Sequence, residues 1–369
     1  MNSTDVCLAL TVTRPFVILS LFLLVVSTIS VIANIFVLYL LFRSHSFHSN
    51  VRLLLRNFTV SAILLSLGLT SKAVYNCYVW QKGLFEISPT ICGLTEIGWT
   101  VGGSALTNAI SLIGLERVIT TIWKKKFTDN DRPSSIALVM AAFCWATGFS
   151  TLAVSILTSL TQDHSLCYCF GILISPKLAV FLTVPVYMLM EVWTILCYLY
   201  LYTRSRSTYL NFTINTTQHS LAERYQLLNN METTTLLAPI MITHGLVYTC
   251  ILCSIVYVRV AVTDMHAIMV YSTVLLSVQN VEAILHPILL LIKHKSMRKA
   301  AVKNFPFLKR VLGDQIELAT AVTAVKFIQQ SGKKDEFKTG RSGLIDFRVK
   351  PEDNDNILNK LWDSKPKAK

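Results

Sequence analysis

The stretch from residue 16 to residue 42, FVILSLFLLVVSTISVIANIFVLYLLF, contains no Asp, Glu, Lys or Arg. Its 27 residues exceed the roughly 20 that an α-helix needs to cross the hydrocarbon core of a bilayer. Residues 134–160 form a second stretch of the same length that also lacks these four residue types. Both stretches therefore predict membrane-spanning helices rather than helices of a water-soluble core.

The whole chain shares this composition. Its 369 residues are 53% hydrophobic and 15% charged, whereas a soluble domain carries about 25% charged residues. A lipid-exposed backbone must satisfy its own hydrogen bonds, so every span is expected to be a helix. The composition excludes a soluble enzyme and predicts an all-α membrane protein built as a bundle of seven transmembrane helices. The spans are expected at about 16–42, 54–79, 92–122, 134–160, 178–202, 234–258 and 267–292.

Basic residues near the span ends predict the orientation of the chain. Without the tail at 313–369, one set of alternate loops and ends contains eighteen Lys or Arg residues and the other set contains five. Because the cytoplasmic side carries the excess of positive charge, residues 1–15 are expected outside and the carboxyl terminus in the cytoplasm. The first apolar run is too long for a cleavable signal peptide. Asn2 opens the sequence Asn-Ser-Thr, a glycosylation site on the outer side.

Three cysteines on the outer side are candidates for a disulfide. Cys92 begins the third span, and Cys167 and Cys169 lie between the fourth and fifth spans. An extracellular position makes disulfides chemically favourable, but sequence does not determine which cysteines pair. We expect a bridge from Cys92 to Cys169 or to Cys167, with Cys7 as a possible second partner. Such a bridge would hold the loop over the mouth of the bundle.

Ionisable residues inside the spans are candidates for function, because each costs a few kcal/mol to bury in a membrane. Helical spacing places Tyr187 with Glu191, and Gln279 with Glu282, on one face of their helices. If these faces converge, they form a partly acidic, aromatic-rich cavity that suits a small ligand with a polar or cationic group. Alternatively, the same residues hold the bundle together through interhelical hydrogen bonds, with Glu191 paired to His244, or Glu282 paired to His286. The expected ligand-binding residues are Glu96, Trp99, Tyr187, Glu191, His244, Tyr248, Gln279 and Glu282.

The inner side has two further features. Glu116 and Arg117 end the third span, where an adjacent acid and base can form an ion pair that opens when helices move. The alternative is that Arg117 only anchors the helix at the lipid headgroups. Residues 293–312 alternate basic and apolar side chains and suit a helix that lies along the membrane surface, and residues 313–369 are expected to be largely disordered.

The chain shows none of the motifs of an enzyme or a cofactor site. It lacks a glycine-rich phosphate loop, an HExxH motif and a nucleophile elbow, and its eight histidines are scattered without ligand spacing. We therefore expect no catalytic residues, no cofactor and no metal.

Three short motifs resemble those of the nematode serpentine chemoreceptors of the Sra superfamily, which comprises the Sra, Srab and Sre classes. Residues 221–227, LAERYQL, together with Asn230, resemble that family's LSxRYQLxEN element, although Ala222 replaces its Ser and Asn229 its Glu. Residues 115–121 resemble the ERxxAT element, and residues 286–288 resemble the NP or HP element of the seventh helix. The RYQL sequence and the following TTTLLAP at 233–239 favour the Sra and Srab classes over the Sre class.

The resemblance covers residues 1–312 and implies a rhodopsin-like receptor that is coupled to heterotrimeric G proteins. It implies a small-molecule ligand and a place in the plasma membrane, including that of chemosensory cilia, and no nucleic acid partner. Glu116, Arg117, Arg224 and Tyr225 are the residues expected to switch the receptor and contact the G protein. The alternative function is a ligand-gated channel or transporter that uses the carboxylates Glu191 and Glu282 on its permeation path.

Overall fold

The computed structural model describes residues 14–43, 47–82, 89–122, 134–160, 169, 177–214, 221–305 and 308. The side chains of residues 89–90, 159, 177–179, 205–232, 265 and 295–296 are not described. Within these residues the secondary structure is entirely helical. The expected glycosylation site at Asn2 and the tail at 313–369 lie outside the described residues.

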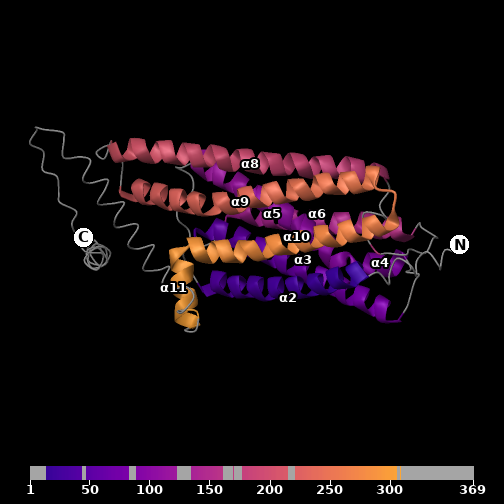
Figure 1. Ribbon diagram of the computed structural model, residues 1–369. Helices are drawn as coiled ribbons and strands as arrows, with labels where there is room; N and C mark the ends of the chain where they lie inside the picture. Colours follow the sequence, from indigo (N-terminus) through magenta and orange to yellow (C-terminus); the bar gives the residue numbers. More distant parts are fainter. Residues whose placement is uncertain are drawn as a thin grey trace, which may run out of the picture. The chain divides into compact units, whose positions relative to one another are not determined.

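Seven of the helices are long and apolar enough to cross a membrane, and Figure 1 shows them running side by side. Two shorter helices are α4 (Pro89–Thr95) and α11 (Lys295–Asn304), and α11 turns away from the direction of the bundle. The long helices are α2 (Arg14–Arg43), α3 (Ser49–Lys82), α5 (Ile97–Ile122), α6 (Ser135–Leu160), α8 (Lys177–Ile214), α9 (Leu221–Ala261) and α10 (Met265–Lys293).

The helices α3 and α5 form the centre of the bundle. In their spans 61% and 67% of the residues are buried inside the protein, against 22% for α6. The helix α3 packs between α2 and α5, α5 also contacts α6 and α8, and α9 joins α8 to α10. The outer faces expose large apolar side chains such as Ile18, Leu157 and Leu189. Large apolar faces of this kind promote aggregation in water, but they suit contact with lipid.

The span expected at 92–122 is divided into two helices in the structure. The helix α4 ends at Thr95 and α5 begins at Ile97, so that Glu96 lies at the junction. The Thr95 hydroxyl donates to the Cys92 carbonyl at 2.9 Å, and the N–H of Glu96 donates to the same carbonyl at 3.2 Å. The interruption is therefore local, and it leaves the Glu96 side chain buried.

The helices α8 and α9 are longer than the expected spans at 178–202 and 234–258. The helix α8 continues to Ile214 and α9 already begins at Leu221. Charged residues such as Arg204 end the apolar window of α8, but a helix satisfies its own backbone hydrogen bonds and can continue into water. The RYQL sequence at 224–227 consequently lies in the first turns of α9.

A partly buried histidine joins α10 to α11. Its partial burial lowers the pKa of His294 to about 4, so its imidazole is neutral at physiological pH and can accept a hydrogen bond. Its Nδ1 accepts from the N–H of Met297 at 3.1 Å and so caps the first turn of α11. The ring also packs on Phe47, with 4.4 Å between the ring centroids. These contacts fix the direction in which α11 leaves α10.

Glycines allow α3 and α5 to approach closely. A Cβ atom on Gly68 would lie 2.3 Å from the backbone nitrogen of Trp99, and one on Gly102 would lie 2.4 Å from the backbone nitrogen of Leu65. Backbone atoms cannot move aside as a flexible side chain can. Small residues at such helix contacts are a common device of membrane bundles, and here they bring the two central helices together.

The substitution Gly102→Ala is expected to destabilise the protein by about 1–3 kcal/mol, because the added methyl group overpacks the contact between α3 and α5. The adjacent Gly103 provides the matched control. A Cβ there would meet its nearest neighbour, the Gln279 side chain, at an ordinary 3.7 Å. In detergent, the melting temperature should fall for Gly102→Ala and hardly change for Gly103→Ala. Equal melting temperatures for the two variants would show that the close approach is unimportant.

Candidate functional site

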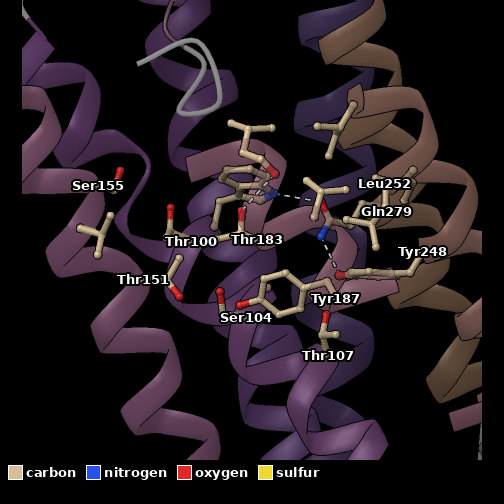
Figure 2. Close-up of a pocket in the computed structure, with 17 residues that line it drawn as sticks. Thr100, Ser104, Thr107, Thr151, Ser155, Thr183, Tyr187, Tyr248, Leu252 and Gln279 are labelled. Carbon is tan, nitrogen blue, oxygen red and sulfur yellow. Dashed lines mark hydrogen bonds between the residues drawn. The ribbon is translucent and has the colours of Figure 1, made fainter. Parts of the chain in front are cut away.

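A cavity of about 200 Å³ lies among α5, α6, α8, α9 and α10. Its apolar wall includes Val180, Val184 and Leu252, and among the described residues that line it none carries a charge. Hydroxyl groups from four different helices, α5, α6, α8 and α9, surround it (Figure 2). The polar lining residues are Thr100, Ser104, Thr107, Thr151, Ser155, Thr183, Tyr187, Tyr248 and Gln279. The wall is therefore neutral but rich in hydrogen-bonding groups.

Four of the eight residues expected from the sequence to bind a ligand line this cavity: Trp99, Tyr187, Tyr248 and Gln279. Three of them are connected. The indole Nε1 of Trp99 donates to Gln279 Oε1 at 2.9 Å, and Gln279 Nε2 donates to the Tyr248 hydroxyl at 2.6 Å (Figure 2). The Gln279 amide is thus held at both ends, which gives one wall of the cavity a fixed arrangement of donors and acceptors.

The other four expected residues, Glu96, Glu191, His244 and Glu282, are not among those that line the cavity. Glu96 forms an ion pair with Lys72 of α3, and each side chain is only 1% exposed. The Lys72 ammonium also lies over the Trp99 ring, 6.0 Å from its centroid. Lys72 therefore joins a carboxylate outside the cavity to an aromatic ring that lines it.

A disulfide covers this ion pair. Cys92 of α4 is bonded to Cys169, with 5.3 Å between their Cα atoms. The Cys169 sulfur lies 3.8 Å from Glu96 Oε1 and 3.4 Å from the Thr95 hydroxyl. Of the alternatives that the sequence left open, the structure contains the bridge to Cys169, whereas Cys7 and Cys167 lie outside the described residues. The disulfide ties Cys169 to α4, close to the junction of α4 and α5.

Deeper in the bundle, two acids and two histidines meet in what we call the His244 cluster, formed by Glu191, His244, Glu282 and His286. His244 Nδ1 lies 2.7 Å from Glu282 Oε1, and His244 Nε2 lies 3.3 Å from Glu191 Oε1. Glu282 also contacts His286 one turn further along α10. Both pairings considered from the sequence, Glu191 with His244 and Glu282 with His286, therefore occur.

Tyr248 connects the cavity with the His244 cluster. Its ring stacks on the His244 imidazole, with 4.1 Å between the ring centroids, while its hydroxyl accepts from Gln279 in the cavity wall. All four members of the cluster are buried, with exposures of 2% or less. A change in the cavity can therefore reach the cluster through a single side chain.

At the other end of α5, the Glu116 and Arg117 side chains form a buried pair. Arg117 donates through Nε to Glu116 Oε2 at 2.7 Å and through Nη2 to Oε1 at 3.1 Å. Arg117 is 2% exposed, so in this structure its side chain is not placed to reach lipid headgroups. Arg224 and Tyr225 lie in α9, in the part whose side chains are not described.

Sequence reasoning placed Tyr198 on the same face of its helix as Glu191 but gave it no role of its own. In the structure Tyr198 of α8 is fully buried, its hydroxyl has no hydrogen-bond partner among the described residues, and its ring packs against the position of Gly114.

Most of the cavity hydroxyls were missed because the search followed charge, and on α5 only Thr100 was considered as a lining residue. Their spacing was visible, since Thr100, Ser104 and Thr107 repeat at helical intervals on one face of α5.

The bundle has seven helices that are long and apolar enough to cross a membrane, and five of them surround the cavity, an arrangement that suits a membrane receptor. The family described as serpentine type 7TM GPCR receptor class ab chemoreceptor matches residues 5–306. The chain is also 23% identical over 296 residues to serpentine receptor class alpha/beta-14 of Caenorhabditis elegans, which covers 76% of this chain and 74% of that protein.

The chain therefore belongs to the class ab serpentine chemoreceptors, which are multi-pass G-protein-coupled receptors and not enzymes. The expected kinship with the Sra and Srab classes is confirmed, and the class is Srab.

Replacing Glu96 with Gln is expected to destabilise the receptor by about 3–5 kcal/mol, because it removes the carboxylate that balances a buried ammonium. The double variant Lys72→Met with Glu96→Gln removes both charges and should regain much of that loss. The melting temperatures of the purified variants test this expectation. If Glu96→Gln is as stable as the wild type, or the double variant is less stable than Glu96→Gln, then the Glu96 carboxylate does not balance the charge of the Lys72 ammonium.

Proposed function

We propose that this receptor binds a small, neutral, hydrogen-bonding molecule in the cavity and transmits binding to a heterotrimeric G protein. The observation that carries the proposal is the composition of the cavity wall. It combines hydroxyl and amide groups with apolar surface and, among the described lining residues, contains no charge. Ligand sites are typically apolar pockets with a few placed polar groups.

The size of the cavity limits the ligand. Its volume of about 200 Å³ lies below the roughly 300–1,000 Å³ of pockets for drug-sized molecules. A compact alcohol, ketone, ester or lactone fits these dimensions and can use the donors and acceptors of Ser104, Thr183 and Gln279.

The sequence favoured a ligand with a polar or cationic group, and the cationic alternative is not retained. A cation in the cavity would meet aromatic rings, but no described carboxylate of the bundle lines the cavity. Glu96 pairs with Lys72, and Glu116 pairs with Arg117. Glu191 and Glu282 both face His244. We therefore propose a ligand that is polar but uncharged.

Tyr248 offers a route from the ligand to the helices. A ligand that bonds to Gln279 competes with the bond between Gln279 and Tyr248, and so changes how Tyr248 rests on His244. His244 contacts α8 through Glu191 and α10 through Glu282. A ligand with a higher affinity for one packing of these three helices would shift the population toward that packing.

The disulfide and the Glu116–Arg117 pair support an orientation for the receptor. They lie toward opposite ends of the α4–α5 segment, and a disulfide belongs in the oxidising extracellular space. Together with the excess of basic residues on the other side, this supports an amino terminus outside and Arg117 on the cytoplasmic side. Asn2 would then be available for glycosylation. The plasma membrane, including that of a chemosensory cilium, is the proposed location.

The helix α11 is proposed to lie along the inner surface of the membrane. Met297 and Ala301 are buried, whereas Lys299 and Lys303 are exposed. Phe305, which caps the helix, packs on Phe36 of α2 at 5.1 Å between ring centroids. An apolar inner face and a basic outer face suit anionic lipid headgroups.

The cytoplasmic ends of α5, α8 and α9 are proposed to contact the G protein. Activation would separate Arg117 from Glu116 as these helices move. The Tyr198 ring packs against the position of Gly114, one turn before Arg117 on α5, and its hydroxyl, which lacks a described hydrogen-bond partner, could then accept from Arg117. Arg224 and Tyr225, at the start of α9, are proposed as part of the same contact surface.

Filling the cavity is expected to weaken the response to its ligand. Thr151→Phe places a ring in the cavity, whereas Phe at the neighbouring Ser150, which is exposed on the outer face of α6, leaves the cavity open. A ligand is first identified by screening small neutral compounds on cells that express the receptor and candidate G proteins, with calcium or cyclic nucleotide as the readout. Thr151→Phe should weaken the response by about tenfold or more, a loss of at least about 1.4 kcal/mol.

Equal potency on both variants, at equal surface expression, would place the ligand elsewhere. A ligand-evoked current in cells that lack the G proteins would instead favour the channel alternative.

The buried pair at residues 116 and 117 is expected to restrain signalling. Glu116→Gln removes the charge that holds the Arg117 guanidinium, so signalling without ligand should rise. Arg117→Ala should abolish signalling with the receptor still at the surface. Tyr198→Phe, which removes only the hydroxyl, should lower the maximal response without affecting ligand binding. Basal and maximal responses in the same cells measure all three, and unchanged signalling in Arg117→Ala would contradict the proposed switch.

A further inference from the structure

Within the His244 cluster, three side chains have the geometry of a metal site. His244, Glu282 and His286 each present one ligand atom, and these atoms all lie within 4.8 Å of one another. A tetrahedral zinc ion with bonds of about 2.0–2.2 Å holds its ligand atoms about 3.3–3.5 Å apart. Glu282 and His286 are one turn apart on α10 and share a face. Closing around an ion therefore needs only small side-chain adjustments.

Several polar atoms of this cluster lack hydrogen bonds. Among the described residues, His286 Nδ1 and Glu282 Oε2 have no hydrogen-bond partner. The Nε2 atoms of His286 and His244 each face a carboxylate oxygen of the cluster, but without the geometry of a hydrogen bond. These side chains are at most 2% exposed. Most buried polar atoms in proteins are hydrogen-bonded, so a buried group with unused lone pairs indicates a missing partner. A bound ion accepts such lone pairs.

The charges of the cluster point the same way. Glu191 and Glu282 lie on opposite sides of one imidazole, and both are 1% exposed or less. With neutral histidines, the cluster would hold two negative charges in a medium that solvates them poorly. One divalent cation would balance both.

From these three observations we propose that His244 Nδ1, Glu282 and His286 Nε2 bind a divalent transition-metal ion, for which Zn²⁺ is the probe. Two imidazole nitrogens and one carboxylate form a typical set of zinc ligands and leave a fourth position for water or a ligand group. Ca²⁺ and Mg²⁺ prefer oxygen ligands alone, so they suit this site less well.

Glu191 takes the role of a positioning residue in this site. Metal-binding histidines commonly donate their second N–H to a carboxylate, which fixes the tautomer and the orientation of the ring. Glu191 Oε1 lies 3.3 Å from His244 Nε2, on the side of the ring opposite Glu282. A proton on Nε2 directed at Glu191 leaves the Nδ1 lone pair available to the metal.

A metal here would join α9 to α10 next to the cavity. His244 comes from α9 and the other two ligands from α10, and Tyr248, which stacks on His244, lines the cavity. The ion would therefore hold together two helices whose relative movement the proposed signalling requires. Metal binding itself is measured on the purified chain without ligand or G protein, so it stands or fails independently of the proposed function.

The direct test is the zinc content of the purified receptor. The full chain is isolated in detergent through a tag without histidines, incubated with ZnCl2 and desalted, and its metal is measured by mass spectrometry. We expect about one zinc ion per chain for the wild type and about a tenth of that or less for His286→Ala, because loss of a ligand removes most of the affinity. His266→Ala, which changes a histidine of α10 outside the cluster, should still bind the ion.

Two further measurements keep the test decisive if a variant folds poorly. Co²⁺ bound to the wild-type chain should show the intense visible absorption of a four-coordinate site. Glu191→Gln should still bind zinc, with an affinity lowered by about 10–100-fold, as for other partners of metal-binding histidines. Wild-type protein that retains no zinc, a cobalt spectrum typical of six-coordinate water, or undiminished zinc in His286→Ala would each overturn the proposal.

Discussion

An ionisable group inside the membrane must find its compensation within the protein, and this constraint organises the whole bundle. Burying an uncompensated charge in lipid costs several kcal/mol, more than a marginally stable protein can absorb at several positions. The structure meets the constraint in three places, at Lys72 with Glu96, in the His244 cluster, and at Glu116 with Arg117. The first two join different helices, so the same contacts that balance charge also hold α3 to the start of α5 and α9 to α8 and α10.

The cavity takes its character from this arrangement. Because the acids are engaged in the pairs and the cluster, hydroxyl and amide groups remain to line the space between the helices. Tyr248 lies between the two environments, bonded to Gln279 on one side and stacked on His244 on the other. The neutral cavity and the charged cluster are therefore separate sites joined by one residue.

The sequence predicts the number of spans and the class of protein well, because charge-free runs such as 16–42 and motifs such as RYQL are local. It predicts the surroundings of a side chain less well. Helical spacing shows that Glu191 and Tyr187 share a face, but only tertiary packing decides that Tyr187 reaches the cavity while Glu191 meets His244. The same limit applies to metal binding. Of the three proposed ligands, only Glu282 and His286 are close in sequence, so the eight histidines showed no ligand spacing.

The central claim is that the buried carboxylates are compensated within the bundle and are not available to a ligand in the cavity. The most direct test is to measure whether neutral or positively charged ligands activate the receptor. Cells expressing the receptor and its G protein are exposed to pairs of small compounds matched in size and shape, each pair comprising a neutral alcohol, ketone or ester and a protonated amine. Compensation within the bundle predicts that activation is confined to the neutral members and is lost in Thr151→Phe. Activation by the amines, abolished by Glu191→Gln or Glu282→Gln, would show that a carboxylate is available to the ligand and would contradict this explanation of the structure.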